Sequence, residues 1–305
     1  MKYMIFLCMI SFLSVFLNAQ KLNDDYIQHI TVNVFKDKDT KFIDIVKSEL
    51  SDRIVKFQYE IKSFPDIDII INIAPDKATY ESWVKGKEKV FENSSAFTNL
   101  KTEEIFIKNP SQFSDDKKFI NVLLHEYIHI FVNYHFHDAP LWFHEGMANY
   151  FSEKQTLNQT FNYIRNNAFN KKYLLLKYAY RYPEQKANIE PYYFQATLII
   201  KRTFEDKMNN LINLFYSSEE YDKFSEAFFA TFGKTQEDYL KNFEKEINNF
   251  FKTHFYIGIM LLTWSLFPIF LIIAKIKQNH RTKKLLQKWD IEEQLAVTNN
   301  EYNGG

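Results

Sequence analysis

The sequence predicts an α+β protein, in which a small α/β sheet subdomain is followed by a mainly helical half and one C-terminal transmembrane helix. Two observations carry this prediction. Apolar residues recur at strand spacing and then at helical spacing along residues 20–254, and residues 255–274 form one apolar run. The chain of 305 residues is 46% hydrophobic, which is enough for a sizeable core. Its 38 Lys and Arg balance its 38 Asp and Glu, so no overall field favours a nucleic-acid partner.

Residues 1–19 have the composition of a secretory signal peptide. One lysine precedes an uncharged stretch, residues 3–17, and Ala19 is a small residue before a cleavage point, so the mature chain is expected to begin at Gln20. An uncleaved N-terminal anchor is the alternative, although a run of about 15 residues is short for a membrane span. The one cysteine, Cys8, lies in this segment, so the mature chain is expected to contain no disulfide.

The N-terminal subdomain, residues 20–113, is predicted to contain a β-α-β unit. Segments 29–35 and 67–73 are rich in Ile and Val and predict strands. Such a unit pairs its two strands in parallel. A third strand is predicted over residues 103–108. Between the first two strands, apolar residues at helical spacing predict a helix: Phe42, Ile45, Val46, Leu50, Ile54, Phe57 and Ile61.

The second half, residues 114–252, is predicted to be mainly helical. One helix is expected over residues 114–134, between the sheet and the helical half, and another over residues 141–153. Gly146 and Ala148 in the second helix have small side chains, which would let this helix approach the first one closely. Several more helices are expected to follow.

The first of these helices contains the HExxH pattern of zinc sites, from His125 to His129. On a helix the two histidines stand four residues and about 40° apart, so both imidazoles can reach one ion, while Glu126 can touch a metal-bound water. Apolar residues surround the motif on nearly all sides, which predicts a buried helix. Unpaired buried polar groups are costly, and a zinc ion would supply the partner. Hydrogen-bonded core histidines are the alternative.

Catalytic zinc usually has three protein ligands and a water, so a third ligand is needed. His135 stands six residues after His129, at the metzincin spacing, but Val132 occupies the position where that motif turns the chain with a glycine. On a continuing helix His135 would point away from the metal. Glu145 is the predicted third ligand, since a second helix after a short loop would project its carboxylate toward the first. An exposed Glu near a helix start is the alternative, and His144 is expected at the surface or in a cleft.

A family resemblance rests on two motifs, His125-Glu126-x-x-His129 and Trp142-x-x-Glu145-Gly146-x-Ala148, and more weakly on a downstream Tyr193-x-Gln195-Ala196. These motifs resemble those of the gluzincin metallopeptidases, in particular the bacterial peptidase MA-like domains, and the resemblance covers roughly residues 100–250. The resemblance implies a zincin-like helical half and zinc-dependent hydrolysis of a peptide or protein substrate, with Glu126 as the catalytic base.

The same resemblance implies a further hydrogen-bond donor to the developing oxyanion, because related enzymes use a downstream Tyr or His. Tyr193 is the candidate and Tyr192 the weaker one, with a packed aromatic side chain as the alternative. The predicted strand over residues 103–108 resembles the edge strand on which such enzymes lay an extended substrate. The chain lacks the GxMEN segment of the clan's aminopeptidases, which favours an endopeptidase.

Residues 255–274 contain no charged side chain and are long enough to span a hydrocarbon core of about 30 Å, so they predict a transmembrane helix. A buried core helix is the alternative. Basic residues follow directly, before the first acidic residue: Lys275, Lys277, Arg281, Lys283, Lys284 and Lys288. By the positive-inside bias, residues 275–305 are expected to form a cytoplasmic tail, with residues 20–254 outside the cytoplasm.

Two hypotheses from other functional classes remain. In the first, the chain is a catalytically inactive metallopeptidase-like membrane receptor or signalling module with a structural zinc. In the second, it is a metal-trafficking protein. Glu126 argues against the first, because a purely structural zinc site has no need of it. The lack of a further His or Cys cluster argues against the second.

Overall fold

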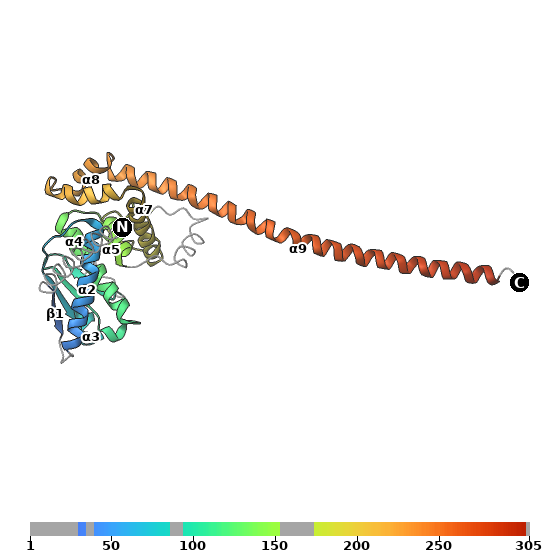
Figure 1. The fold of residues 1–305 in the computed structure, drawn as a ribbon, viewed down its shortest axis with the longest axis horizontal. Coiled ribbons are helices and arrows are strands. Elements are labelled where there is room, and N and C mark those ends of the chain that lie inside the picture. Colours follow the sequence, from blue (N-terminus) through green and yellow to red (C-terminus); the bar gives the residue numbers. More distant parts are fainter. Residues whose placement is uncertain (1–29, 35–39, 86–93, 153–173, 303–305) are drawn as a thin grey trace, which may run out of the picture. The chain divides into compact units, whose positions relative to one another are not determined.

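The computed structural model describes residues 30–34, 40–85, 94–152 and 174–302 (Figure 1). The predicted signal peptide lies outside the described residues. The part of the chain that is described is α+β, with a four-stranded sheet followed by helices, which confirms the predicted fold class at that level.

The sheet has the order β1-β2-β4-β3. Strands β1 (Ile30–Val34) and β2 (Ile69–Ile73) pair in parallel, as predicted, with helix α2 (Thr40–Ile61) between them in the chain. Strand β4 (Glu104–Ile107) pairs in parallel with β2 and antiparallel with β3 (Ala96–Asn99). The sheet is therefore mixed, with β1 and β3 at its edges.

One prediction about the sheet is wrong. The strand expected over residues 103–108 is β4, which has neighbours on both sides, so it is not the edge strand. The edge strand next to it is β3, which was not predicted from the sequence. Strand β3 has only four residues, Ala-Phe-Thr-Asn, and lacks the Ile and Val run that marks the other strands. Helix α3 (Lys77–Val84) was not predicted either; the Asp76 side chain caps it by accepting from the Thr79 amide at 2.8 Å.

The apolar stripe of α2 is buried against its neighbours, including helix α4 (Asp116–His135). Five of its seven predicted positions are buried, from Val46 to Ile61, whereas Ile45 is exposed. Helix α4 also contacts β3 and β4, so it lies between the sheet and the helices that follow. This position gives α4 the apolar surroundings that its sequence predicted.

Four further helices follow α4 along the described chain: α5 (Leu141–Ser152), α7 (Ile189–Tyr216), α8 (Phe224–Phe232) and α9 (Gln236–Tyr302). Short 3₁₀ turns lie between some of them: η1 (Pro110–Gln112), η2 (Lys186–Asn188) and η3 (Ser217–Glu219). Helix α5 packs against both α4 and α7. The second predicted helix is therefore sandwiched between two others.

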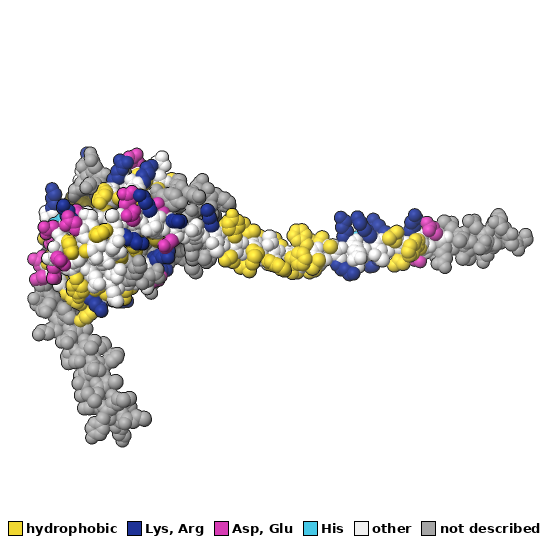
Figure 2. Space-filling view, turned by 90° about the horizontal axis from the view of Figure 1, so that it is seen from above, with side chains coloured by type: hydrophobic (Ala, Val, Ile, Leu, Met, Phe, Trp, Pro, Cys, Tyr) yellow, Lys and Arg dark blue, Asp and Glu magenta, His cyan; other side chains and the backbone are white. Residues whose placement is uncertain are grey.

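The chain divides into two compact units, residues 1–245 and residues 246–305. The second unit is the C-terminal part of α9, and within it Phe255–Glu292 is long and apolar enough to cross a membrane. Its apolar side chains are exposed, for example Phe270 at 68%, which fits the predicted span better than a core helix. Helix α9 continues through Pro268 and past the span, where Figure 2 shows Lys and Arg side chains clustered after the apolar stretch.

Candidate metal centre

The two histidines of the HExxH motif lie one turn apart on α4. The helix begins at an N-cap, where the Asp115 carboxylate accepts from the Lys118 amide at 2.7 Å. Leu124 and Ile128, which alternate with the histidines, are buried. The Nε2 atoms of His125 and His129 stand 3.2 Å apart, so both rings turn toward the same point.

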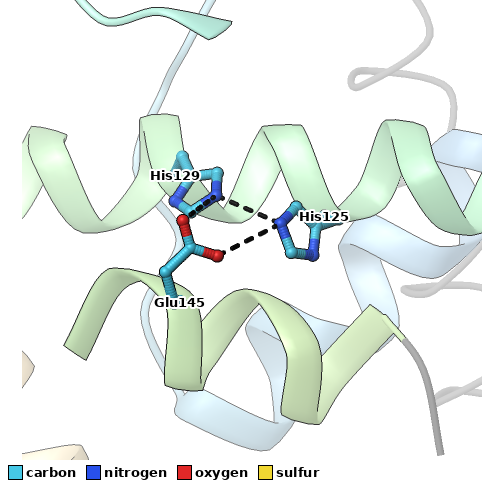
Figure 3. A group of neighbouring side chains, drawn as sticks. All are labelled: His125, His129 and Glu145. Carbon is cyan, nitrogen blue, oxygen red and sulfur yellow. Dashed lines mark hydrogen bonds and ion pairs between the residues drawn. The ribbon is translucent and has the colours of Figure 1, made fainter. Parts of the chain in front are cut away.

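Glu145 comes to that point from α5 (Figure 3). Its carboxylate is almost completely buried, with Oε2 3.7 Å from His125 Nε2 and Oε1 3.9 Å from His129 Nε2. The three donor atoms all lie within 4.8 Å of one another. A tetrahedral ion with bonds of about 2.0–2.1 Å keeps its ligand atoms about 3.3 Å apart, so this group has the size to hold one metal ion. The predicted convergence of these three residues is present.

Close packing of α5 against α7 places Glu145. A Cβ atom on Gly146 would lie 2.4 Å from the Ala196 carbonyl oxygen and 2.6 Å from Ile200 Cγ1, so no larger residue fits there without a shift of backbone. From the sequence, Gly146 was expected to let α5 approach α4. That expectation is wrong, because Gly146 stands about 100° round α5 from Glu145 and faces α7 instead.

Glu126 is buried next to His125, and its side chain is held by the edge strand. The hydroxyl of Thr98 on β3 donates to Glu126 Oε2 at 2.6 Å and lies 3.2 Å from the Glu126 carbonyl oxygen. Burial raises the pKa of Glu126 to about 7, while the hydrogen bond from Thr98 opposes the rise. A carboxylate with a pKa near 7 is suited to accept and release a proton at neutral pH. A bound cation would draw this pKa down.

Tyr182, which no sequence motif marks, contacts the candidate ligand Glu145. Its hydroxyl donates to Glu145 Oε1. Burial raises the pKa of Glu145 to about 8, and the Tyr182 hydrogen bond opposes the rise. Tyr182 lies in an irregular segment before η2, 37 residues from its partner in sequence. Nothing in its local sequence distinguishes it among 19 tyrosines.

The two predicted tyrosine candidates differ in their surroundings. Tyr192 is completely buried, and its hydroxyl donates to the Tyr178 carbonyl oxygen at 3.2 Å, so it packs in the core. Tyr193 is only partly buried, and its ring centroid is 6.4 Å from that of Tyr182. Burial raises the pKa of Tyr193, and the charges of Glu145 and Glu126 raise it further. Tyr193 therefore lies near both carboxylates of the site.

His135 lies away from this group. Helix α4 extends to His135, so the ring points away from the metal group, and it is held by other residues. Its Nε2 is 2.9 Å from the Ser63 hydroxyl and its Nδ1 is 2.8 Å from the Ser218 hydroxyl. Burial lowers the pKa of His135 to about 4. The prediction that His135 is not grouped with the other two histidines is confirmed.

The expectation that His144 lies at the surface or in a cleft is wrong. His144 is buried, because α5 is covered on more than one side, and its ring centroid is 5.7 Å from that of His129. Among the described residues its Nδ1 has no hydrogen-bond partner. Burial lowers the pKa of His144 to about 4, so the ring is neutral at pH 7. His144 packs beside the candidate metal group without belonging to it.

Comparison with protein-family models and with curated proteins found no match to this chain.

Proposed function

We propose that the chain is a membrane-anchored zinc metallopeptidase whose catalytic part faces away from the cytoplasm. One observation carries the proposal: His125, His129 and Glu145 place their donor atoms within 4.8 Å of one another, beside a buried Glu126. Two imidazoles and one carboxylate form a donor set that suits zinc, with a further position for water. The resemblance to the gluzincin peptidases, drawn from the two sequence motifs, supports the same assignment.

In this proposal Glu126 is the general base. Bound zinc would acidify a coordinated water and polarise the scissile carbonyl. Glu126 would accept a proton from the attacking water and deliver it to the leaving amine. Its Oε2 is held by Thr98, which limits the carboxylate to few orientations. Tyr193 would donate a hydrogen bond from its hydroxyl to the oxyanion as charge develops there.

The substrate would lie along β3. An extended peptide can add to a free sheet edge through main-chain hydrogen bonds, and β3 is the edge strand that carries Thr98. A peptide in that position would lie beside Glu126, as a substrate of an endopeptidase must. We infer that β3 takes the role that the sequence resemblance gave to the strand at residues 103–108.

The membrane anchor in this proposal is the apolar stretch of α9. Phe255–Glu292 contains the predicted span of residues 255–274. The basic residues that follow residue 274 favour the cytoplasmic side for the tail. Residues 20–254 would then lie outside the cytoplasm, and the tail from residue 275 inside it.

The test is peptide hydrolysis by the full mature chain in detergent micelles. An unbiased peptide library should be cleaved, cleavage should stop with a chelator, and zinc should restore it. Glu126→Gln keeps the size of the side chain but cannot take up the proton, so hydrolysis should fall about a hundredfold or more while zinc stays bound. A chain that binds zinc but cleaves no peptide would instead be the inactive receptor or signalling module. Equal cleavage by Glu126→Gln would refute the assignment of the base.

A further inference from the structure

The structure assigns to Tyr182 the task of holding Glu145 in the orientation that the metal requires, so that this hydroxyl sets the affinity of the site. This inference rests on the metal site of the proposed function. It concerns a residue that no motif of the sequence marks and that stands on neither helix carrying a ligand.

The carboxylate of Glu145 has two oxygens with different neighbours. Oε1 accepts the hydrogen bond from Tyr182 and lies 3.9 Å from His129 Nε2, while Oε2 lies 3.7 Å from His125 Nε2. The hydrogen bond to Oε1 occupies one of its lone pairs and stops the carboxylate from rotating freely. Oε2 is then left to meet the ion, which favours coordination through one oxygen. Hydrogen bonds of this kind to a ligand commonly change metal affinity by about ten- to a hundredfold.

The segment that carries Tyr182 is itself held in place. Its first described residue, Leu174, donates its amide to the Gln195 side chain on α7 at 3.2 Å. The Ala179 carbonyl oxygen accepts from the Leu141 amide at the start of α5 at 2.7 Å. The segment is thus tied to α7 and to the helix of Glu145 itself. A donor on an anchored segment costs little conformational entropy to position, which is what a fixed orienting contact needs.

The ring of Tyr182 has its own support. It meets the Tyr193 ring at 6.4 Å between centroids with an interplanar angle of 74°, an edge-to-face contact. Tyr182→Phe keeps this contact and removes only the hydroxyl. The variant therefore separates the hydrogen bond to Glu145 from the packing of the ring.

The experiment measures zinc affinity of the full mature chain in detergent by competition with a chelating dye. We expect Tyr182→Phe to bind zinc about ten- to a hundredfold more weakly than wild type, with the melting temperature of the metal-free protein nearly unchanged. Tyr180→Phe is the matched control, because Tyr180 is in the same segment and 71% exposed. Its affinity should equal that of wild type.

A second measurement uses Co²⁺ in place of zinc, because the visible absorption of cobalt reports coordination geometry. With the hydroxyl removed, both oxygens of Glu145 are free to bind, so the Tyr182→Phe spectrum should move toward a higher coordination number. This change is not expected from a tyrosine that only stabilises the fold.

Three results would overturn the inference. Unchanged zinc affinity in Tyr182→Phe would show that the hydroxyl does not orient the ligand. Unchanged affinity with reduced turnover at saturating zinc would place the role of the Tyr182 hydroxyl in turnover, for example through its hydrogen bond with Tyr193, and not in metal binding. A wild-type chain that binds no zinc would end this inference and the proposed function together. Zinc binding without peptide cleavage would end the proposed function alone, and the affinity difference would still decide on Tyr182.

Discussion

Helix α4 contributes histidines to two clusters with different neighbours. In the first, which we call the metal group, His125, His129 and Glu145 face one another. In the second, which we call the serine cluster, His135 lies between Ser63 and Ser218. The Ser218 hydroxyl donates to the Phe215 carbonyl oxygen at 2.7 Å, so it accepts from His135 Nδ1. The Ser63 hydroxyl can donate to Nε2, so both ring nitrogens of a neutral His135 are satisfied.

The metal group brings two ring nitrogens and a carboxylate to one point. The two Nε2 atoms stand 3.2 Å apart, beside a carboxylate with little exposure. One cation would satisfy all three side chains together. The contrast shows that burial of a histidine on a helix does not by itself indicate a metal ligand. The chemistry of the groups opposite the ring decides.

The largest expected effect is on zinc binding, which substitutions in the metal group should reduce and a substitution of His135 should not. His129→Ala or Glu145→Ala removes one of three ligands and should weaken zinc binding about a thousandfold or more. His135→Ala should keep about one zinc per chain, because His135 contacts serines and not the metal group. Metal content after dialysis, measured by elemental analysis, checks all three variants. Loss of zinc in His135→Ala with retention in Glu145→Ala would establish the metzincin-like scheme instead.

The parts of the site predicted from sequence are those that local spacing determines. His125, His129 and the exclusion of His135 follow from the 100° step of one helix. Glu145 followed from a short loop between two helices. The parallel pairing of β1 and β2 followed from a β-α-β pattern, with each strand marked by Ile and Val.

The parts that were missed depend on contacts between segments far apart in sequence. Thr98 is on a four-residue strand that is defined by pairing with β4, and its partner Glu126 is 28 residues away. Tyr182 reaches Glu145 from an irregular segment that has no periodicity. His144 was expected to be accessible, because the sequence of one helix does not show what covers it. The packing of α5 against its neighbours buries this side chain.

A smaller effect on kcat should distinguish the neighbouring residues Tyr193 and Tyr192. Tyr193→Phe should lower kcat by about ten- to a thousandfold with unchanged zinc content, because the hydroxyl near the carboxylates is lost. Tyr192→Phe should leave kcat close to wild type and lower the melting temperature by a few degrees, because the buried Tyr178 carbonyl loses its partner. Turnover of both variants at saturating zinc gives the comparison. Wild-type kcat in Tyr193→Phe would assign Tyr193 to packing.

The smallest expected effect concerns His135 in the serine cluster and the pH dependence of folding stability. The pKa of His135 is about 4 in the folded protein, against about 6.5 for an unperturbed histidine. Between these values the unfolded chain binds a proton that the folded chain does not, so stability falls as pH drops from about 6.5 to about 4. Above pH 6.5 both forms are neutral and this penalty is absent.

His135→Gln tests this dependence, because glutamine offers a donor and an acceptor to the two serines without titrating. The ring is partly accessible, so we expect the wild type to lose about 1–2 kcal/mol more than the variant across this pH range, less than the full pKa difference implies. Urea unfolding of the metal-free chains in detergent, with a chelator present, keeps zinc release out of the comparison. The other titrating groups, His129 among them, are common to both chains and cancel in the difference. Parallel pH profiles for the two chains would show that the serines hold the ring equally well when it is protonated, and His135 would then carry no acid sensitivity.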